Sequence, residues 1–126
     1  MKLIRIAATI AISAVFYYIG VGASSEKAMA QDWVNQNRAA ALLVQEGNAL
    51  KDNGSIQEAE ALYRRAIQQH PDYANGYRVL GLFVNYYFQH DRQEALQHYT
   101  KFRDLCQAQN LDCVDYAESL IERVRN

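Results

Sequence analysis

Apolar side chains recur every three or four positions along most of the chain after residue 32, the spacing of helices that bury one face. The pattern predicts five helices: residues 33–52, 56 to the His70-Pro71 pair, 74–89, 92 to about Cys106, and 112–125. Nowhere do apolar and polar residues alternate with the period of two that is typical of a strand. The predicted fold class is therefore all-α.

The residues at the predicted breaks are those that favour helix ends. Asn53-Gly54 follows the first helix, and such a pair favours the left-handed backbone conformation that ends a helix. Ser55 precedes the second helix with Glu58 three residues later, which is the spacing of a capping box. We expect Asp91 and Asp112 to cap the fourth and fifth helices in the same way.

A repeat underlies the helices. Gly47 and Gly81 each lie in the middle of the first helix of a pair. Their separation equals the repeat length of the tetratricopeptide repeat family, which the sequence resembles and whose units are helix–turn–helix pairs of about 34 residues. In the first unit, residues 40–73, the matching positions are Leu43, Gly47, Leu50, Gly54, Ala59, Tyr63, Ala66 and Pro71. In the second, residues 74–109, they are Tyr77, Leu80, Gly81, Ala95 and Tyr99.

The second unit departs from the family pattern. It has two additional residues between Gly81 and Ala95, which we expect to lengthen the third helix, and it lacks the closing proline. The helix at 112–125 is expected to cap the stack, because a repeat array needs a terminal element with a polar outer face. The resemblance implies two antiparallel helix pairs plus this capping helix, stacked as a short right-handed solenoid after an N-terminal signal or anchor helix.

The segment at residues 1–30 has the composition of an export signal. Lys2 and Arg5 precede an uncharged stretch at residues 6–23, and the triplet from Ala28 to Ala30 has the small residues of a cleavage site. We expect cleavage after Ala30, leaving residues 31–126 as the repeat domain. The alternative is an uncleaved membrane anchor, since the uncharged stretch approaches the length of a spanning helix. Both alternatives place the domain outside the cytoplasm, as a periplasmic or secreted protein, because the basic residues near the N-terminus stay on the cytoplasmic side of the membrane.

Composition and charge exclude two classes of protein. Half of the residues are apolar and the net charge is −1, which excludes a disordered chain. Losing Lys2, Arg5, Glu26 and Lys27 with the signal would leave a net charge of −3. Such a domain has no general attraction to nucleic acid or to anionic lipid, so the membrane is a partner only through an uncleaved N-terminal segment.

Few residues carry chemistry. Cys106 and Cys113 flank the joint between the last two helices, and in an exported protein they favour a disulfide over two separately buried thiols. The histidines at positions 70, 90 and 98 do not share a helix face at ligand spacing, so we expect no metal and no cofactor. No phosphate-binding loop or catalytic motif is present in the sequence, which argues against an enzyme.

The resemblance implies a concave groove that binds a segment of another protein. Carried over position by position, the groove residues are Ala41, Val44, Asn48, Lys51, Asn75, Arg78, Leu82 and Asn85. Some members of the family hold a terminal carboxylate with a lysine and an asparagine around the signature glycine. Asn48 matches that asparagine, but Val44 stands at the lysine position, so we expect this clamp to be absent.

An aromatic stretch at the end of the third helix offers a second surface. Tyr86, Tyr87 and Phe88 are either enclosed in the stack or exposed as a patch for a partner. Two functions follow. The first is an exported adaptor or scaffold that binds a protein segment, and the second is a membrane-anchored accessory subunit of an envelope assembly or chaperone complex. The expected partner is another protein or peptide, with a second copy of the chain as a further candidate.

Overall fold

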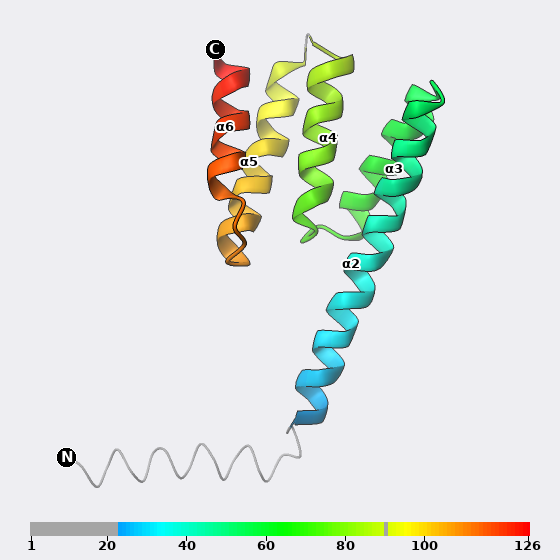
Figure 1. Ribbon diagram of the computed structural model, residues 1–126, viewed down its shortest axis with the longest axis vertical. Coiled ribbons are helices and arrows are strands. Elements are labelled where there is room, and N and C mark those ends of the chain that lie inside the picture. Colours follow the sequence, from blue (N-terminus) through cyan, green and yellow to red (C-terminus); the bar gives the residue numbers. More distant parts are fainter. Residues whose placement is uncertain (1–22, 90) are drawn as a thin grey trace, which may run out of the picture. The chain divides into compact units, whose positions relative to one another are not determined.

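The computed structural model describes residues 23–89 and 91–126. In this part of the chain it contains helices and no strands, which confirms the all-α prediction (Figure 1). The helices are α2 (Ala23–Asp52), α3 (Ile56–Gln69), α4 (Ala74–Tyr87), α5 (Arg92–Ala108) and α6 (Val114–Arg125). None of these described helices is long and apolar enough to cross a membrane.

The chain divides into two units, at residues 1–35 and 36–126. Of the first unit, residues 23–35 are described, and they are helical, with the side-chain amide of Gln31 donating to Asn35 Oδ1 at 3.2 Å. Residues 1–22, which include most of the predicted signal, lie outside the described residues. Ala28 and Ala30 lie in the helical backbone of α2, and cleavage between Ala30 and Gln31 stays a prediction.

The second unit is a stack of helices in chain order. Helix α3 packs on α4, α4 on α5 and α5 on α6, and successive helices run in opposite directions (Figure 1). The core consists of the apolar stripes predicted from the sequence. Its largest fully buried side chains are Tyr63, Tyr99, Leu80, Ile121, Val84 and Cys106. This arrangement is that of a short helical repeat array, as the period of the sequence predicted.

Each helix pair is joined by the same close contact. A Cβ atom added to Gly47 would lie 2.6 Å from Cε1 of Tyr63, and one added to Gly81 would lie 2.6 Å from Cε1 of Tyr99. No side chain larger than hydrogen fits such a gap without displacing the ring. The tyrosine therefore fills the space that the glycine leaves, and the two helices of a pair come close together.

The expected side-chain caps do not form. Neither Ser55 nor Asp91 makes a capping hydrogen bond, although both occupy the N-cap positions of their helices. With ψ angles of 70° and 47° both depart from the extended backbone that turns a capping side chain toward the first free amides. Helix α6 has Cys113 at its N-cap in place of Asp112, so it begins later than predicted.

The additional residues of the second unit are divided between a helix and a connection. Helix α4 ends at Tyr87, six residues after Gly81, whereas α2 ends five residues after Gly47. The following connection has four residues in place of three. Helix α4 therefore extends one residue further beyond its glycine than α2 does. It ends two residues before the predicted Gln89.

A tight turn brings the two cysteines together. Asn110 has a left-handed backbone with φ of 53°, and the amide of Leu111 donates to the carbonyl of Cys106 at 2.8 Å. The Cα atoms of Cys106 and Cys113 lie 5.7 Å apart, with their sulfur atoms at bonding distance. This spacing is typical of a disulfide, whose formation in the exported protein stays a prediction.

A polar network joins the outer helices of the two pairs. The guanidinium of Arg64 on α3 lies 2.7 Å from carboxylate oxygens of both Glu60 and Glu94. Nε2 of His98 lies 3.2 Å from the same oxygen of Glu94. Because Glu94 and His98 are on α5, the network links the first repeat to the second.

Candidate functional site

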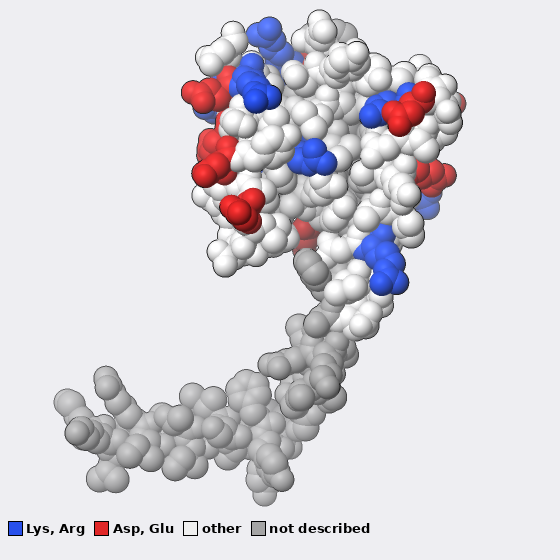
Figure 2. All heavy atoms as spheres, viewed as in Figure 1, with Lys and Arg blue, Asp and Glu red and all other residues white. Residues whose placement is uncertain are grey.

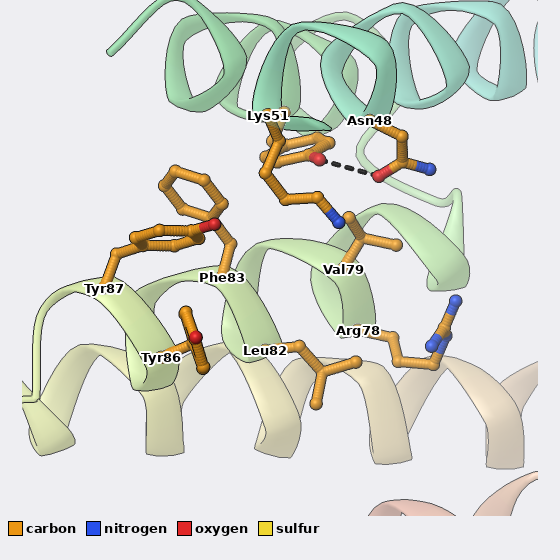
Figure 3. Close-up of a pocket in the computed structure, with 9 residues that line it drawn as sticks. Asn48, Lys51, Arg78, Val79, Leu82, Phe83, Tyr86 and Tyr87 are labelled. Atoms are coloured by element: carbon orange, nitrogen blue, oxygen red, sulfur yellow. Dashed lines mark hydrogen bonds between the residues drawn. The ribbon is translucent and has the colours of Figure 1, made fainter. Parts of the chain in front are cut away.

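A cavity of about 410 Å³ opens between α2, α3 and α4. Its lining combines cations, polar groups and aromatic rings (Figure 3). The lining residues are Asn48, Lys51, Tyr63, Arg78, Val79, Leu82, Phe83, Tyr86 and Tyr87. This is large enough to hold several side chains of a bound segment.

Parts of the two surfaces that the sequence offered as alternatives line one cavity. Asn48 and Lys51 line it from α2, and Arg78 and Leu82 line it from α4. Tyr86 and Tyr87 of the aromatic stretch line its far end, and Figure 3 shows Tyr87 at the opposite end of the cavity from Arg78. The helical period explains this, because positions 78, 82 and 86 recur every four residues and so share one face of α4.

The other predicted groove residues lie elsewhere. Ala41 is exposed on α2, whereas Val44 is only 5% exposed and belongs to the core. Asn75 is half-buried, and its Oδ1 accepts a hydrogen bond from Nε of Arg78 at 2.7 Å. Asn85 faces a separate hollow with Gln89, Arg92, Arg123 and Val124.

A partly buried hydrogen bond fixes the side of the cavity formed by α2. The hydroxyl of Tyr63 donates to Oδ1 of Asn48 at 2.6 Å, drawn as the dashed line in Figure 3. Burial and the nearby charge of Asp52 raise the pKa of Tyr63 to about 12, so the hydroxyl keeps its proton and donates. Asn48 therefore presents its amide nitrogen, a donor, rather than its oxygen to a ligand.

The charge of the cavity is positive. The ammonium of Lys51 lies 3.5 Å from the exposed carboxylate of Asp52, its neighbour in sequence. Arg78 makes no ion pair with a carboxylate in the described part of the chain, and among those residues no Asp or Glu lines the cavity. Figure 2 shows one face of the molecule, on which the charged side chains lie mainly along the edges, with a basic side chain near the centre.

Aromatic rings in tilted and edge-on contact form the aromatic end of the cavity. The ring centroids of Phe83 and Tyr87 are 4.8 Å apart, and those of Tyr86 and Tyr87 are 4.7 Å apart. Phe88 is half-buried, with its ring 6.0 Å from Phe83. Tyr86 is 71% exposed, and its ring meets that of Tyr87 edge-on. An exposed tyrosine beside other aromatic rings is a typical anchor for a protein partner.

Three lining residues were not predicted as site residues. Tyr63 was assigned as a repeat position and Phe83 was not singled out, and both are buried in the core while also reaching the cavity. Val79 lies beside Arg78 and was not singled out. The available signal was the helical position of Val79 and Phe83, one turn apart on α4 and adjacent to predicted groove residues.

The described residues contain no group of three His, Cys, Asp or Glu side chains that could hold a metal ion. The cavity is lined by amide, hydroxyl, cationic and aromatic groups, which are suited to binding.

Comparison with known proteins identifies the repeat. Residues 40–83 match the tetratricopeptide repeat family. The chain carries a tetratricopeptide repeat. The matched segment spans the second half of α2, all of α3 and part of α4, and it contains every residue of the cavity except Tyr86 and Tyr87. No curated protein and no solved structure matches the chain. Tetratricopeptide repeats are typically protein-interaction modules without catalytic activity.

Proposed function

We propose that this chain is an adaptor that works outside the cytoplasm and binds an extended segment of another protein in the cavity between α2, α3 and α4. The observation that carries this proposal is the union of a cationic and polar groove with an exposed aromatic anchor, Tyr86, in one cavity. Binding sites for proteins combine such anchors with a few fixed polar groups.

The proposed compartment has separate support. The basic residues and apolar stretch at the N-terminus are typical of an export signal. The spacing of Cys106 and Cys113 suits a disulfide, which persists in oxidising compartments such as the periplasm. Both features favour a protein that acts outside the cytoplasm, either free or attached through its N-terminal segment.

Site-specific photo-crosslinking in the living cell tests the binding surface. A photoreactive residue is placed at Tyr86, which lines the cavity, and in a matched variant at Leu42, which is 59% exposed on α2 and does not line it. We expect a discrete crosslinked product from position 86 and none of the same size from position 42. Arg78→Glu should abolish the product, because it reverses the charge in the cavity with little loss of packing.

Two results would contradict the proposal. One is the absence of any product from position 86 in a folded, exported protein. The other is the same product from both positions regardless of the charge at Arg78, which would indicate contact without a specific site.

A further inference from the structure

One row of side chains on α4 lines the main cavity. Arg78, Leu82 and Tyr86 recur every four residues, which places them on the same side of the helix. Figure 3 shows them in this order along α4, with the cation at one end, the aliphatic side chain in the middle and the aromatic ring at the other end. The helix therefore presents three different chemistries to the cavity in a fixed order.

The cation of this row is held by residues at the start of α4. Nε of Arg78 donates to Oδ1 of Asn75 at 2.7 Å, and the amide nitrogen of Asn75 donates to the Tyr73 hydroxyl at 3.3 Å. This chain of hydrogen bonds uses Nε and leaves the two terminal guanidinium nitrogens without a partner in the described part of the chain. Both are donors, so this end of the cavity is suited to a carboxylate.

The groups opposite the row also favour an acidic ligand. Lys51 lines the cavity from α2, and its neighbour Asp52 does not line it. Asn48 presents its amide nitrogen, because its oxygen accepts the hydrogen bond from Tyr63. Among the described residues, the cavity thus has two cations and an amide donor but no carboxylate.

The spacing of the row fits an extended chain. An α-helix rises about 1.5 Å per residue, so successive members of the row lie about 6 Å apart along α4. In an extended chain, the side chains that share a face are two residues apart, or about 6.6 Å. A segment that runs along α4 can therefore place every second side chain opposite one member of the row. An extended segment also suits a cavity of about 410 Å³ better than a helix, whose diameter with side chains is about 10 Å.

We propose that the cavity selects an extended segment with an acidic side chain on Arg78, an aliphatic one two residues away on Leu82 and an aromatic one four residues away beside Tyr86. This inference rests on the proposed function and specifies the sequence of the segment that is bound. Side chains, rather than the main chain, face α4 in this arrangement, so the carboxylate belongs to an Asp or Glu. The row fixes the spacing for either direction of the bound chain.

Peptides of identical composition test the spacing. The two probes are acetylated, amidated peptides, Gly-Asp-Thr-Leu-Thr-Phe-Gly and its reverse, Gly-Phe-Thr-Leu-Thr-Asp-Gly. Their rearranged controls are Gly-Asp-Leu-Thr-Phe-Thr-Gly and its reverse, in which the acidic side chain faces away from the two apolar ones in an extended chain. A third version of each probe has Asn in place of Asp. Binding to the full chain, as delivered by the cell, is measured by two-dimensional NMR titration.

We expect one of the two probes to bind the native protein. Its rearranged control should bind at least fivefold more weakly, because its three side chains cannot meet the row together. The version with Asn should bind about tenfold more weakly, the effect of one hydrogen bond to a charged group.

Two arginine variants locate the carboxylate. Arg78→Gln removes a charge from the cavity, and Arg123→Gln is the matched control, because Arg123 lines the separate hollow. Arg78→Gln should weaken binding of the acidic probe about tenfold and bind the version with Asn as the native protein does. Arg123→Gln should change neither affinity more than twofold. Thermal unfolding shows whether both variants are folded, and the comparison of Asp with Asn in the native protein does not depend on them.

Three results would overturn the inference. Equal affinity for a probe and its rearranged control would show that the spacing is not selected. Equal affinity for the Asp and Asn versions, or equal weakening by Arg78→Gln and Arg123→Gln, would show that Arg78 does not hold the carboxylate. Failure of both probes to bind at millimolar concentration would contradict the inference as well. Photo-crosslinking from Tyr86 would still test the proposed function, because it detects a partner of any sequence.

Discussion

The ring of Tyr99 rests on Gly81 so closely that a Cβ atom on the glycine would lie 2.6 Å from Cε1 of the tyrosine. Gly47 and Tyr63 show the same distance, although the second pair is separated by two more residues in sequence. The additional residues thus leave the contact between paired helices unchanged. This contact explains why the glycines and tyrosines recur at fixed positions, and it positions α4, which carries most of the cavity.

Gly81→Ala should destabilise the protein in spite of the higher helix propensity of alanine. The added methyl group meets the Tyr99 ring inside a packed core, where overpacking costs about 1–3 kcal/mol. Gly47→Ala should have a similar effect, because Tyr63 stands equally close. Urea unfolding measures both. A variant as stable as the native protein would show that the ring moves freely, and Gly81→Ala combined with Tyr99→Leu should recover part of the loss.

Much of the fold was predictable, because it depends on the positions of apolar and small residues. Ala59, Tyr63 and Ala66 are buried, as their helical spacing predicted. The caps were not predictable in detail, because the N-cap rule assumes an extended backbone that Ser55 and Asp91 do not adopt. Propensity describes a residue's average preference, and the connection around it decides its actual dihedral angles.

The candidate site was predictable only in part. Arg78 and Lys51 were assigned to the groove by their repeat positions, and both line the cavity. Val44 was assigned in the same way but is buried, because an apolar side chain at the groove margin turns into the core. The hydrogen bond from Tyr63 to Asn48 was not foreseen, since it depends on which residue follows the glycine, and Leu82 stands at the matching position of the second repeat.

Tyr63→Phe and Tyr99→Phe should differ in stability. The first removes a hydrogen bond of 2.6 Å and leaves Oδ1 of Asn48 without its donor, which should cost about 1 kcal/mol. The second removes no hydrogen bond within the described residues and should leave the free energy of unfolding within about 0.5 kcal/mol of the native value. Urea unfolding at neutral pH compares them. Equal losses would show that the two hydroxyls are in equivalent surroundings.

Oxidation of Cys106 and Cys113 should stabilise the protein. Closing this short loop restricts the unfolded chain and is worth roughly 2–3 kcal/mol in the chain-entropy model. We expect the exported protein to have no thiol that reacts with an alkylating agent, and reduction or Cys113→Ser to lower its melting temperature. Two alkylated cysteines in the native exported protein would contradict this prediction.

Residues 1–40 should direct export. Fused to a reporter enzyme that is active only outside the cytoplasm, they should give activity, and replacing Lys2 and Arg5 with acidic residues should reduce it. The N-terminal residue of the purified protein distinguishes a cleaved signal from an uncleaved anchor: Gln31 indicates cleavage, and Met1 indicates a retained anchor. A reporter that stays inactive would contradict the proposed location outside the cytoplasm.

Low pH should decrease the free energy of unfolding through protonation of His98, which lies at the joint between the repeats. Burial lowers the pKa of His98, and this outweighs the hydrogen bond to Glu94, which raises it. The unfolded chain therefore binds a proton more readily than the folded one. Stability is complete above the ordinary histidine pKa of about 6.5 and falls as the pH drops toward the lower folded value.

Variants at the same joint decide whether His98 causes this effect. His98→Gln should flatten the pH dependence of the urea midpoint between about pH 7 and 5, because no group at that position then binds a proton. Glu94→Gln should steepen it, because Glu94 raises the pKa of His98 and its removal lets burial lower that pKa further. Glu94 itself has a lowered pKa: burial raises it, but hydrogen bonds from Arg64 and His98 outweigh burial, so its own contribution is lost only at lower pH. If His98→Gln keeps the native slope, the acid sensitivity arises at another group.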